Sequence, residues 1–235
     1  MLPKQPPPNA PAPPPSVAAL RSRRRHHIIW GIGIASLLLF LVVGLLSPIV
    51  LRSRKNADQT EAVNNAREIH KALFEFDVEF GEFPNASTIP KVRSETSTTI
   101  PLGTTSSNDY FRQLLAMGLG NEKMFYSKSR KSRKPDDLFD GVKALQKGEC
   151  GFAYVVGLST SEDTSTPLVI SPVTPGANRF DPAIFKGKAV VLRIDGSAMS
   201  YTIRKDGKID LGKGDLFDPA KAEWRGKPLT IVWPE

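Results

Sequence analysis

Four aspartates near the end of the chain are the residues best suited, by type and spacing, to bind a metal ion. Asp206, Asp210, Asp215 and Asp218 lie within the glycine-rich stretch KDGKIDLGKGDLFD. Carboxylate oxygens on a flexible loop suit Ca²⁺, although this spacing matches no EF-hand. Aspartate beside glycine is also a common turn pair. The stretch therefore predicts either a Ca²⁺ loop held by Asp206, Asp210 and Asp215 or a set of plain turns, and we expect no other cofactor.

Two residues of types that often carry catalysis lack the partners they would need. Cys150 is the only cysteine, which excludes an intramolecular disulfide, and a nucleophilic cysteine needs a histidine beside it. His70 is the only histidine after position 27, and no metal-ligating residue lies four positions before or after it. The chain also lacks Gly-x-Ser-x-Gly, His-Glu-x-x-His and phosphate-loop motifs. We therefore expect a protein that is not an enzyme.

A long apolar run precedes the part of the chain that holds these residues. Residues 28–51 contain no ionisable side chain, and a helix of that length covers about 36 Å, more than the roughly 30 Å of a hydrocarbon core. The run ends without the Ala-x-Ala pattern of a cleaved signal peptide. It predicts a single uncleaved transmembrane helix, and the alternative is a buried core helix.

Charge is distributed unevenly along the chain. Eight of the 32 Lys and Arg residues lie in the first 57 positions, where no acidic residue occurs, so the remaining 24 balance the 24 acidic residues. A globular part without a basic excess argues against nucleic acid as a partner. The basic residues before the apolar run predict a cytoplasmic N-terminus and a periplasmic C-terminal domain in the bacterial inner membrane.

Composition divides the chain into five regions. The first is rich in proline and predicts a disordered tail. The second is a basic flank, the third the transmembrane helix, the fourth an amphipathic helix next to the membrane, and the fifth an α+β domain that packs with that helix. Their bounds are 1–20, 21–27, 28–51, 52–84 and 85–235.

The fourth region has the period of an amphipathic helix. Apolar residues recur at steps of three or four, which places them on one face: Val63, Ala66, Ile69, Leu73, Phe76 and Phe80. Gly81 is placed to end the helix, and Pro84 blocks its continuation. Beyond it, the sequence predicts a loop over 85–108, a short helix over 109–119 and a short strand over 123–129.

After Gly151 the period changes to that of strands. GFAYVVGLS, TPLVISPV and GKAVVLRIDGSAMSYTIRKDGKI contain short apolar or alternating runs separated by turn residues. The pair Asp195-Gly196 lies between two such runs, where glycine supplies the positive φ of a tight hairpin. The helices and these strands predict an α+β fold, with the amphipathic helix packed on an antiparallel sheet.

The order of these regions resembles that of type IV pilins and of the pseudopilins of type II secretion systems. NNAREIHKALFEFDVEFGEFP resembles the helix-to-loop junction of pseudopilin-like proteins. Three further segments resemble type II secretion-like proteins of planctomycete and verrucomicrobial lineages: NDYFRQLLAMGL, AVVLRIDGSAMSYTI and LFDPAKAEWRGKP. The resemblance covers residues 28–235 and implies a pilin-like fold, a non-enzymatic role in secretion or pilus assembly, and a Ca²⁺ loop near the C-terminus.

The sequence departs from that family within the apolar run. A prepilin has a glutamate five positions after its cleavage glycine, whereas IGIAS follows Gly31 and residues 28–51 contain no glutamate. A new, unpaired ammonium in lipid would be costly, so we expect an unprocessed pilin-like component with lipid and other pilin-like or secretion-system subunits as partners. The alternative is a single-pass, membrane-tethered module that binds a ligand or senses a signal.

Overall fold

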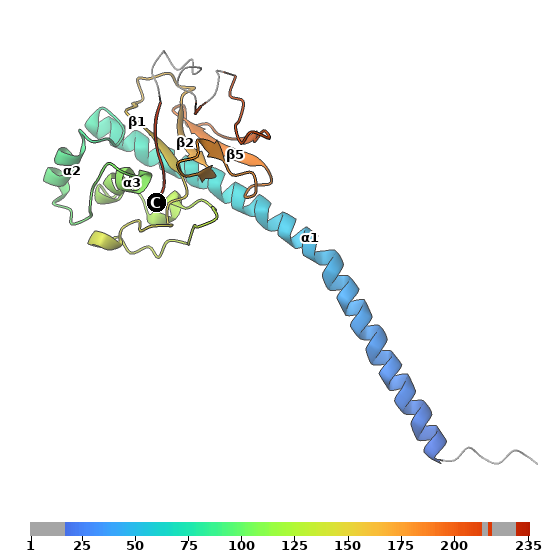
Figure 1. Cartoon of the computed structure of the whole chain (residues 1–235). Helices are drawn as coiled ribbons and strands as arrows, with labels where there is room; N and C mark the ends of the chain where they lie inside the picture. The colour runs from blue at the N-terminus through green and yellow to red at the C-terminus, as the bar shows by residue number, and fades with distance from the viewer. Residues whose placement is uncertain (1–16, 213–215, 218–228) are drawn as a thin grey trace, which may run out of the picture. The chain divides into compact units, whose positions relative to one another are not determined.

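The computed structural model describes residues 17–212, 216–217 and 229–235 (Figure 1). The chain divides into two compact units, residues 1–52 and 53–235, and helix α1 (Val17–Phe80) has residues in both. Before Ser53, side chains are described at seven positions of α1: Trp30, Gly33, Ile34, Ser36, Leu37, Phe40 and Leu41. Residues 1–16 of the predicted proline-rich tail lie outside the described residues.

The prediction that the fold includes a transmembrane helix over residues 28–51 is wrong. Crossing a hydrocarbon core takes about 20 consecutive apolar residues in one helix. Over the residues that the structure describes, no helix combines that length with that apolar character.

The last third of α1 belongs to the second unit and forms part of its core. Four of the six residues that the helical period predicts for its apolar face are fully inaccessible, Ala66, Ile69, Leu73 and Phe76. The other two, Val63 and Phe80, are partly buried against the same core, and Ala62 joins the buried face as well. The helix ends at Phe80, and Gly81 follows with φ 77° and donates its amide to Asp77 O at 2.7 Å. The amphipathic helix and its glycine end are therefore confirmed.

A five-stranded antiparallel sheet lies against α1 in this unit (Figure 1). Its order is β6-β5-β2-β1-β7, and β3 and β4 form a separate two-stranded ribbon. The strands are β1 (Ala153–Val156), β2 (Pro167–Ser171), β3 (Val173–Thr174), β4 (Arg179–Phe180), β5 (Lys188–Arg193), β6 (Ala198–Thr202) and β7 (Thr230–Val232). The predicted α+β class with an antiparallel sheet is confirmed.

Both faces of the sheet are covered. Along β5, Val190 and Leu192 join the core cluster that contains α1, whereas Ala189 and Val191 join a second cluster on the opposite face. Residues of the β3–β4 ribbon and of the segment after β6 complete that second cluster. Because successive strand residues point to opposite faces, the central strands are apolar at nearly every position.

The connection between α1 and the sheet contains more helix than the sequence predicts. The expected loop over 85–108 includes α2 (Ile89–Thr96), which has a proline in its first turn and buries Val92. The predicted short helix is α3 (Ser107–Ala116), and its capping box joins Ser106 to Asp109. The expected strand over 123–129 is instead partly a 3₁₀ helix, η1 (Glu122–Phe125). A second such turn is η2 (Gly141–Lys143).

The predicted hairpin between β5 and β6 is confirmed, and its glycine is required twice over. Gly196 has φ 80°, and a Cβ at this position would lie 2.8 Å from His70 Cε1. The His70 ring cannot easily move, since its Nε2 is 2.9 Å from Ile194 O. The turn and the helix face therefore constrain each other.

Gly196→Ala is expected to lower the free energy of unfolding by about 2 kcal/mol, because both a strained φ and the imidazole contact oppose the added methyl group. Chemical denaturation of the purified chain measures this. Gly187→Ala is the control, since Gly187 has a similar φ of 72° but open space around its Cα. Equal losses for the two variants would show that the His70 contact contributes nothing.

Candidate functional site

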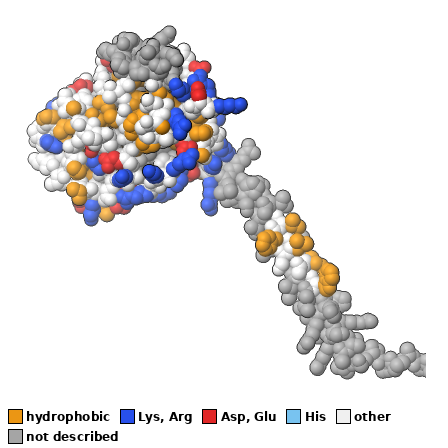
Figure 2. All heavy atoms as spheres, in the orientation of Figure 1, with side chains coloured by type: hydrophobic (Ala, Val, Ile, Leu, Met, Phe, Trp, Pro, Cys, Tyr) orange, Lys and Arg blue, Asp and Glu red, His pale blue; other side chains and the backbone are white. Residues whose placement is uncertain are grey.

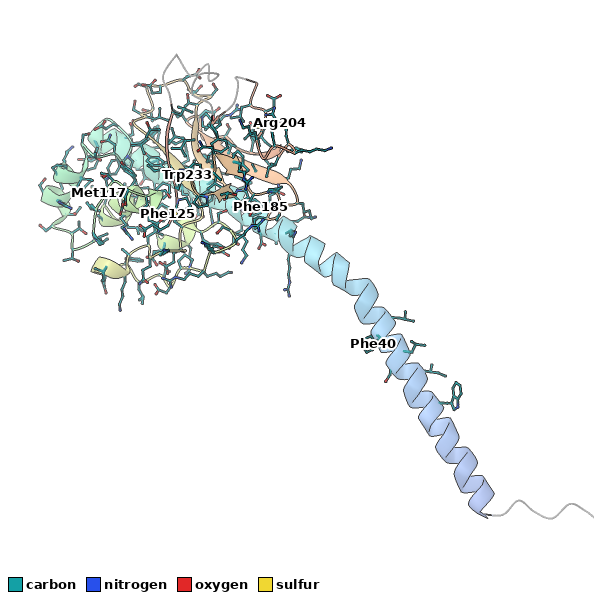
Figure 3. All side chains as sticks on the ribbon, in the orientation of Figure 1. Phe40, Met117, Phe125, Phe185, Arg204 and Trp233 are labelled. Carbon is teal, nitrogen blue, oxygen red and sulfur yellow. The ribbon has the colours of Figure 1, made fainter. Side chains whose placement is uncertain are left out.

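The aspartates predicted to bind Ca²⁺ are described at two of their positions. Asp206 is exposed, accepts a hydrogen bond from the Lys208 amide at 3.0 Å and pairs with Arg204 at 3.2 Å. Figure 3 shows Arg204 at the surface of the second unit. The Lys208 amide and then Arg204 lower the pKa of Asp206. Asp210 accepts from the Gly212 amide at 2.8 Å, so each described carboxylate closes its own turn.

The third predicted ligand, Asp215, lies outside the described residues, as does Asp218. A calcium loop at Asp206, Asp210 and Asp215 therefore stays a prediction. Its two described members have one carboxylate oxygen each engaged by a backbone amide two residues further along the chain.

Cys150 is a buried thiol, as expected for a cysteine near the start of a strand. Its sulfur lies 3.4 Å from Phe152 O and 3.7 Å from Ser107 Oγ. Burial raises the pKa of this thiol to about 12. Since the thiolate is the nucleophile, Cys150 is inert at neutral pH.

Alkylation of Cys150 at pH 8 is expected to be at least about a thousandfold slower in the native chain than in urea, because the raised pKa lowers the thiolate fraction by about that factor. Mass spectrometry after timed iodoacetamide treatment gives both rates. Similar rates in the two states would contradict the burial of this side chain.

The structure brings together three carboxylates that the sequence does not single out. Glu122 in η1, Asp136 in the following loop and Glu149 before β1 each place one carboxylate oxygen within 4.8 Å of the other two. Glu122 and Glu149 are fully buried, whereas Asp136 is exposed. This group, Glu122, Asp136 and Glu149, is called the carboxylate cluster below.

Local hydrogen bonds hold each member of the carboxylate cluster. One oxygen of Glu122 accepts from the Leu145 amide, and Glu149 Oε2 accepts from the Gln146 amide at 2.6 Å. Asp136 Oδ1 accepts from the Leu138 amide at 3.0 Å. The backbone amides of Leu138, Leu145 and Gln146 thus point at the carboxylates of the cluster.

The segment that supplies these amides is anchored to α3. Arg112 donates through Nε to Ala144 O at 2.9 Å and through a second nitrogen to Leu145 O at 3.0 Å. Asn108 also donates to Leu145 O, at 3.0 Å. The sequence offers no signal for this arrangement, because 27 positions separate Glu122 from Glu149 and no periodic pattern connects them.

The carboxylate cluster has an unbalanced electrostatic environment. Burial, followed by the charges of Glu149 and Asp136, raises the pKa of Glu122, while the backbone amides of Leu145 and Asp137 oppose the rise. Arg133 approaches Glu149 Oε1 at 3.2 Å. Glu122 Oε2 and Glu149 Oε1 nevertheless have no hydrogen-bond partner of normal geometry.

A second feature is an open hollow of about 470 Å³ beside the β3–β4 ribbon. Its charged lining residues are Arg130, Arg179, Asp181, Lys205 and Asp206. Arg130 and Asp181 pair through two contacts of 2.5 and 3.2 Å, and this hydrogen bonding lowers the pKa of Asp181. Three cations against two anions make the hollow suitable for a small anion.

No protein-family model, curated protein or solved structure matches the chain. The likeness to type IV pilins and pseudopilins therefore stays a prediction from the sequence.

Proposed function

We propose that the protein is a non-enzymatic, pilin-like component of an envelope assembly of the type II secretion or type IV pilus kind. The order of the elements supports this. The helix α1 has 64 residues, and its last third packs on the antiparallel sheet of the second unit. The buried thiol of Cys150 and the engaged ring of His70 agree with a role without catalysis. Association with the envelope belongs to the same proposal, since the basic segment 21–27 suits anionic headgroups.

The observation that carries the proposal is an exposed apolar face on the first unit's part of α1. Trp30, Ile34, Leu37 and Leu41 follow steps of four, three and four, so they share one face. Their exposed fractions are 71%, 53%, 62% and 53%. Figure 2 shows hydrophobic side chains along this stretch. This face, Trp30, Ile34, Leu37 and Leu41, is called the apolar stripe below.

A like helix from another subunit is the occupant that fits the apolar stripe. A hollow of about 260 Å³ lies on it, lined by Trp30, Gly33, Ile34 and Leu37. Gly33 leaves open space above its Cα, so a side chain from a facing helix can enter there, as in other close helix pairs. Covering apolar surface contributes about 25 cal/mol per Å², which favours such pairing.

Cysteine crosslinking in the full chain tests this. Cys150 is buried and gives little background, so Ile34→Cys is expected to form a disulfide-linked dimer, or a crosslink to another pilin-like subunit, in cells under mild oxidation. Ser36→Cys is the matched control, since Ser36 is exposed but lies on a different side of α1. Absence of any crosslink from Ile34→Cys, or equal crosslinking from both variants, would refute helix pairing through the stripe.

The hollow at Arg130, Arg179 and Lys205 favours a second candidate function, an envelope module that binds a ligand. Its ligand would be a small anion such as a phosphate or carboxylate group, held by charge-assisted hydrogen bonds. Calorimetric titration of the full chain with inorganic phosphate tests this, with Arg179→Gln as the variant expected to lose binding. Heat that is absent, or unchanged in that variant, would remove the support for this candidate.

A further inference from the structure

One fully buried oxygen of the carboxylate cluster, Glu122 Oε2, has no hydrogen-bond partner, which is unusual for a folded protein. Buried polar groups are nearly always hydrogen-bonded, because an unpaired buried charge is costly. Glu122 and Glu149 are fully inaccessible. Glu122 Oε2 accepts no hydrogen bond of normal geometry, and the contact of Glu149 Oε1 is the ion pair with Arg133 at 3.2 Å. Each belongs to a carboxylate that places an oxygen within 4.8 Å of the other two members of the cluster. We propose that Glu122, Asp136 and Glu149 bind a divalent cation, for which Ca²⁺ is the best fit.

The charge around the carboxylate cluster matches a divalent ion. Three carboxylates face one nearby cation, Arg133, which lies 3.2 Å from Glu149 Oε1. The same guanidinium also donates to Gln146 Oε1 at 2.7 Å and Lys147 O at 3.1 Å. Lys123, next to Glu122 in the chain, pairs with Asp137 at 2.7 Å and is not directed at the cluster. The cluster therefore has two negative charges in excess, which a divalent cation would neutralise.

The ligand set and its spacing favour Ca²⁺ among divalent cations. All three ligands are carboxylate oxygens, which suit hard cations such as Ca²⁺ and Mg²⁺. Softer metals prefer sulfur or imidazole ligands, and the carboxylate cluster contains neither. Two ligands on opposite sides of Ca²⁺ are about 4.6–5.2 Å apart, whereas around Mg²⁺ the same separation is about 4.2 Å. The three oxygens lie within 4.8 Å of one another, which is inside the range of separations between Ca²⁺ ligands.

The surroundings of the carboxylate cluster explain how the ion would enter and be held. Asp136 is exposed, so the site has an open side through which water can complete the six to eight oxygens that Ca²⁺ prefers. The other two ligands lie in segments fixed by backbone amides and, through Leu145, by Arg112. The ion would join η1, the 136–138 loop and the turn before β1. This inference is independent of the pairing of α1 helices, because it concerns the second unit alone.

Titration of the full chain with CaCl₂ after removal of metal by EDTA tests the inference. Calorimetry is expected to show one site, and saturating Ca²⁺ is expected to raise the Tm, with a weaker effect of MgCl₂ at equal concentration. Glu122→Gln and Asp136→Asn are expected to weaken Ca²⁺ binding about tenfold or more. Asp136→Asn is expected to fold normally, because its exposed side chain can still accept the hydrogen bond from the Leu138 amide. Loss of binding in this variant therefore reports loss of a ligand and not misfolding.

Asp206→Asn and Asp210→Asn are the matched controls, because they remove carboxylates of the C-terminal stretch and leave the carboxylate cluster intact. They are expected to bind Ca²⁺ as the wild-type chain does. If Ca²⁺ gives no heat and no change in Tm, the inference is wrong. If binding survives Glu122→Gln and Asp136→Asn but is lost in the two controls, the ion belongs to the C-terminal stretch.

Discussion

Gly151→Ala is expected to be the most damaging single methyl addition in the second unit. A Cβ at Gly151 would lie 2.0 Å from Ser127 O and 2.7 Å from Ser127 C. Both are backbone atoms, so no side-chain rotation can relieve the overlap. The Gly151 amide donates to Phe125 O at 3.0 Å, and its carbonyl accepts from Ser171 Oγ at 3.0 Å. A shift of this backbone therefore also disturbs the end of η1 and strand β2.

The free energy of unfolding of Gly151→Ala is expected to fall by more than about 3 kcal/mol. Domains of this kind have total stabilities of about 5–15 kcal/mol, so the variant would lose a large part of its folded population. Urea denaturation followed by circular dichroism measures the loss. Gly157→Ala is the control, because Gly157 has φ 83° but open space around it, and it should cost about 1 kcal/mol. A Gly151→Ala midpoint equal to that of the wild type would contradict the close approach.

Arg112→Ala is expected to lower the free energy of unfolding by about 3–5 kcal/mol, the range for breaking a buried ion pair by removal of one partner. Arg112 pairs with Asp109 at 2.8 Å, and the side chains of both residues are about one-tenth exposed. Its removal also leaves the carbonyl of Ala144 without its Arg112 donor. Denaturant titration measures the effect, and Arg204→Ala is the contrast, because both side chains of its ion pair with Asp206 are about half exposed. Loss of such an exposed pair is expected to cost much less than loss of Arg112.

The effect of Arg112→Ala is expected to depend on pH through Asp109. Burial by itself raises the pKa of Asp109, but the Thr105 hydroxyl and amide, Arg112 and the Ser106 amide outweigh it and lower the pKa. A carboxylate with a lowered folded-state pKa stabilises the protein above its unfolded pKa of about 3.9, and this contribution is lost as the pH falls through the folded value. The difference between wild type and variant should therefore be larger at pH 7 than at pH 2.5. A difference that does not change with pH would show that Arg112 acts through its carbonyl contacts alone.

Those parts of the fold that depend on neighbours in the chain were predictable. The period of Ala66, Ile69 and Leu73 predicted the buried face of α1, and a single glycine after Phe80 predicted its end. The pair Asp195-Gly196 predicted the β5–β6 hairpin, which the structure confirms. These signals are local, because helix period, glycine ends and tight turns each depend on a few consecutive residues.

The sequence-based prediction failed for the loop expected over 85–108 and for the transmembrane helix expected over 28–51. Polar composition predicted a loop over 85–108, but burial of Val92 against the core stabilises α2. The apolar composition of residues 28–51 predicted a transmembrane helix, which the described residues do not supply. For metal binding, aspartates crowded together in sequence drew attention to Asp206 and Asp210. Each closes a turn where it is described, and the calcium loop stays a prediction.

The sequence by itself determined the α+β class, the buried face of α1 and the hairpin of the sheet, because each follows from a short-range pattern of apolar and turn residues. Only the tertiary structure decided that the carboxylates of Glu122, Asp136 and Glu149 lie within 4.8 Å of one another. These residues have no common period, and Arg112 on α3 brings the Leu145 segment to Glu122 through contacts over more than 30 positions. Such a site arises from how separate turns pack, which no local pattern encodes.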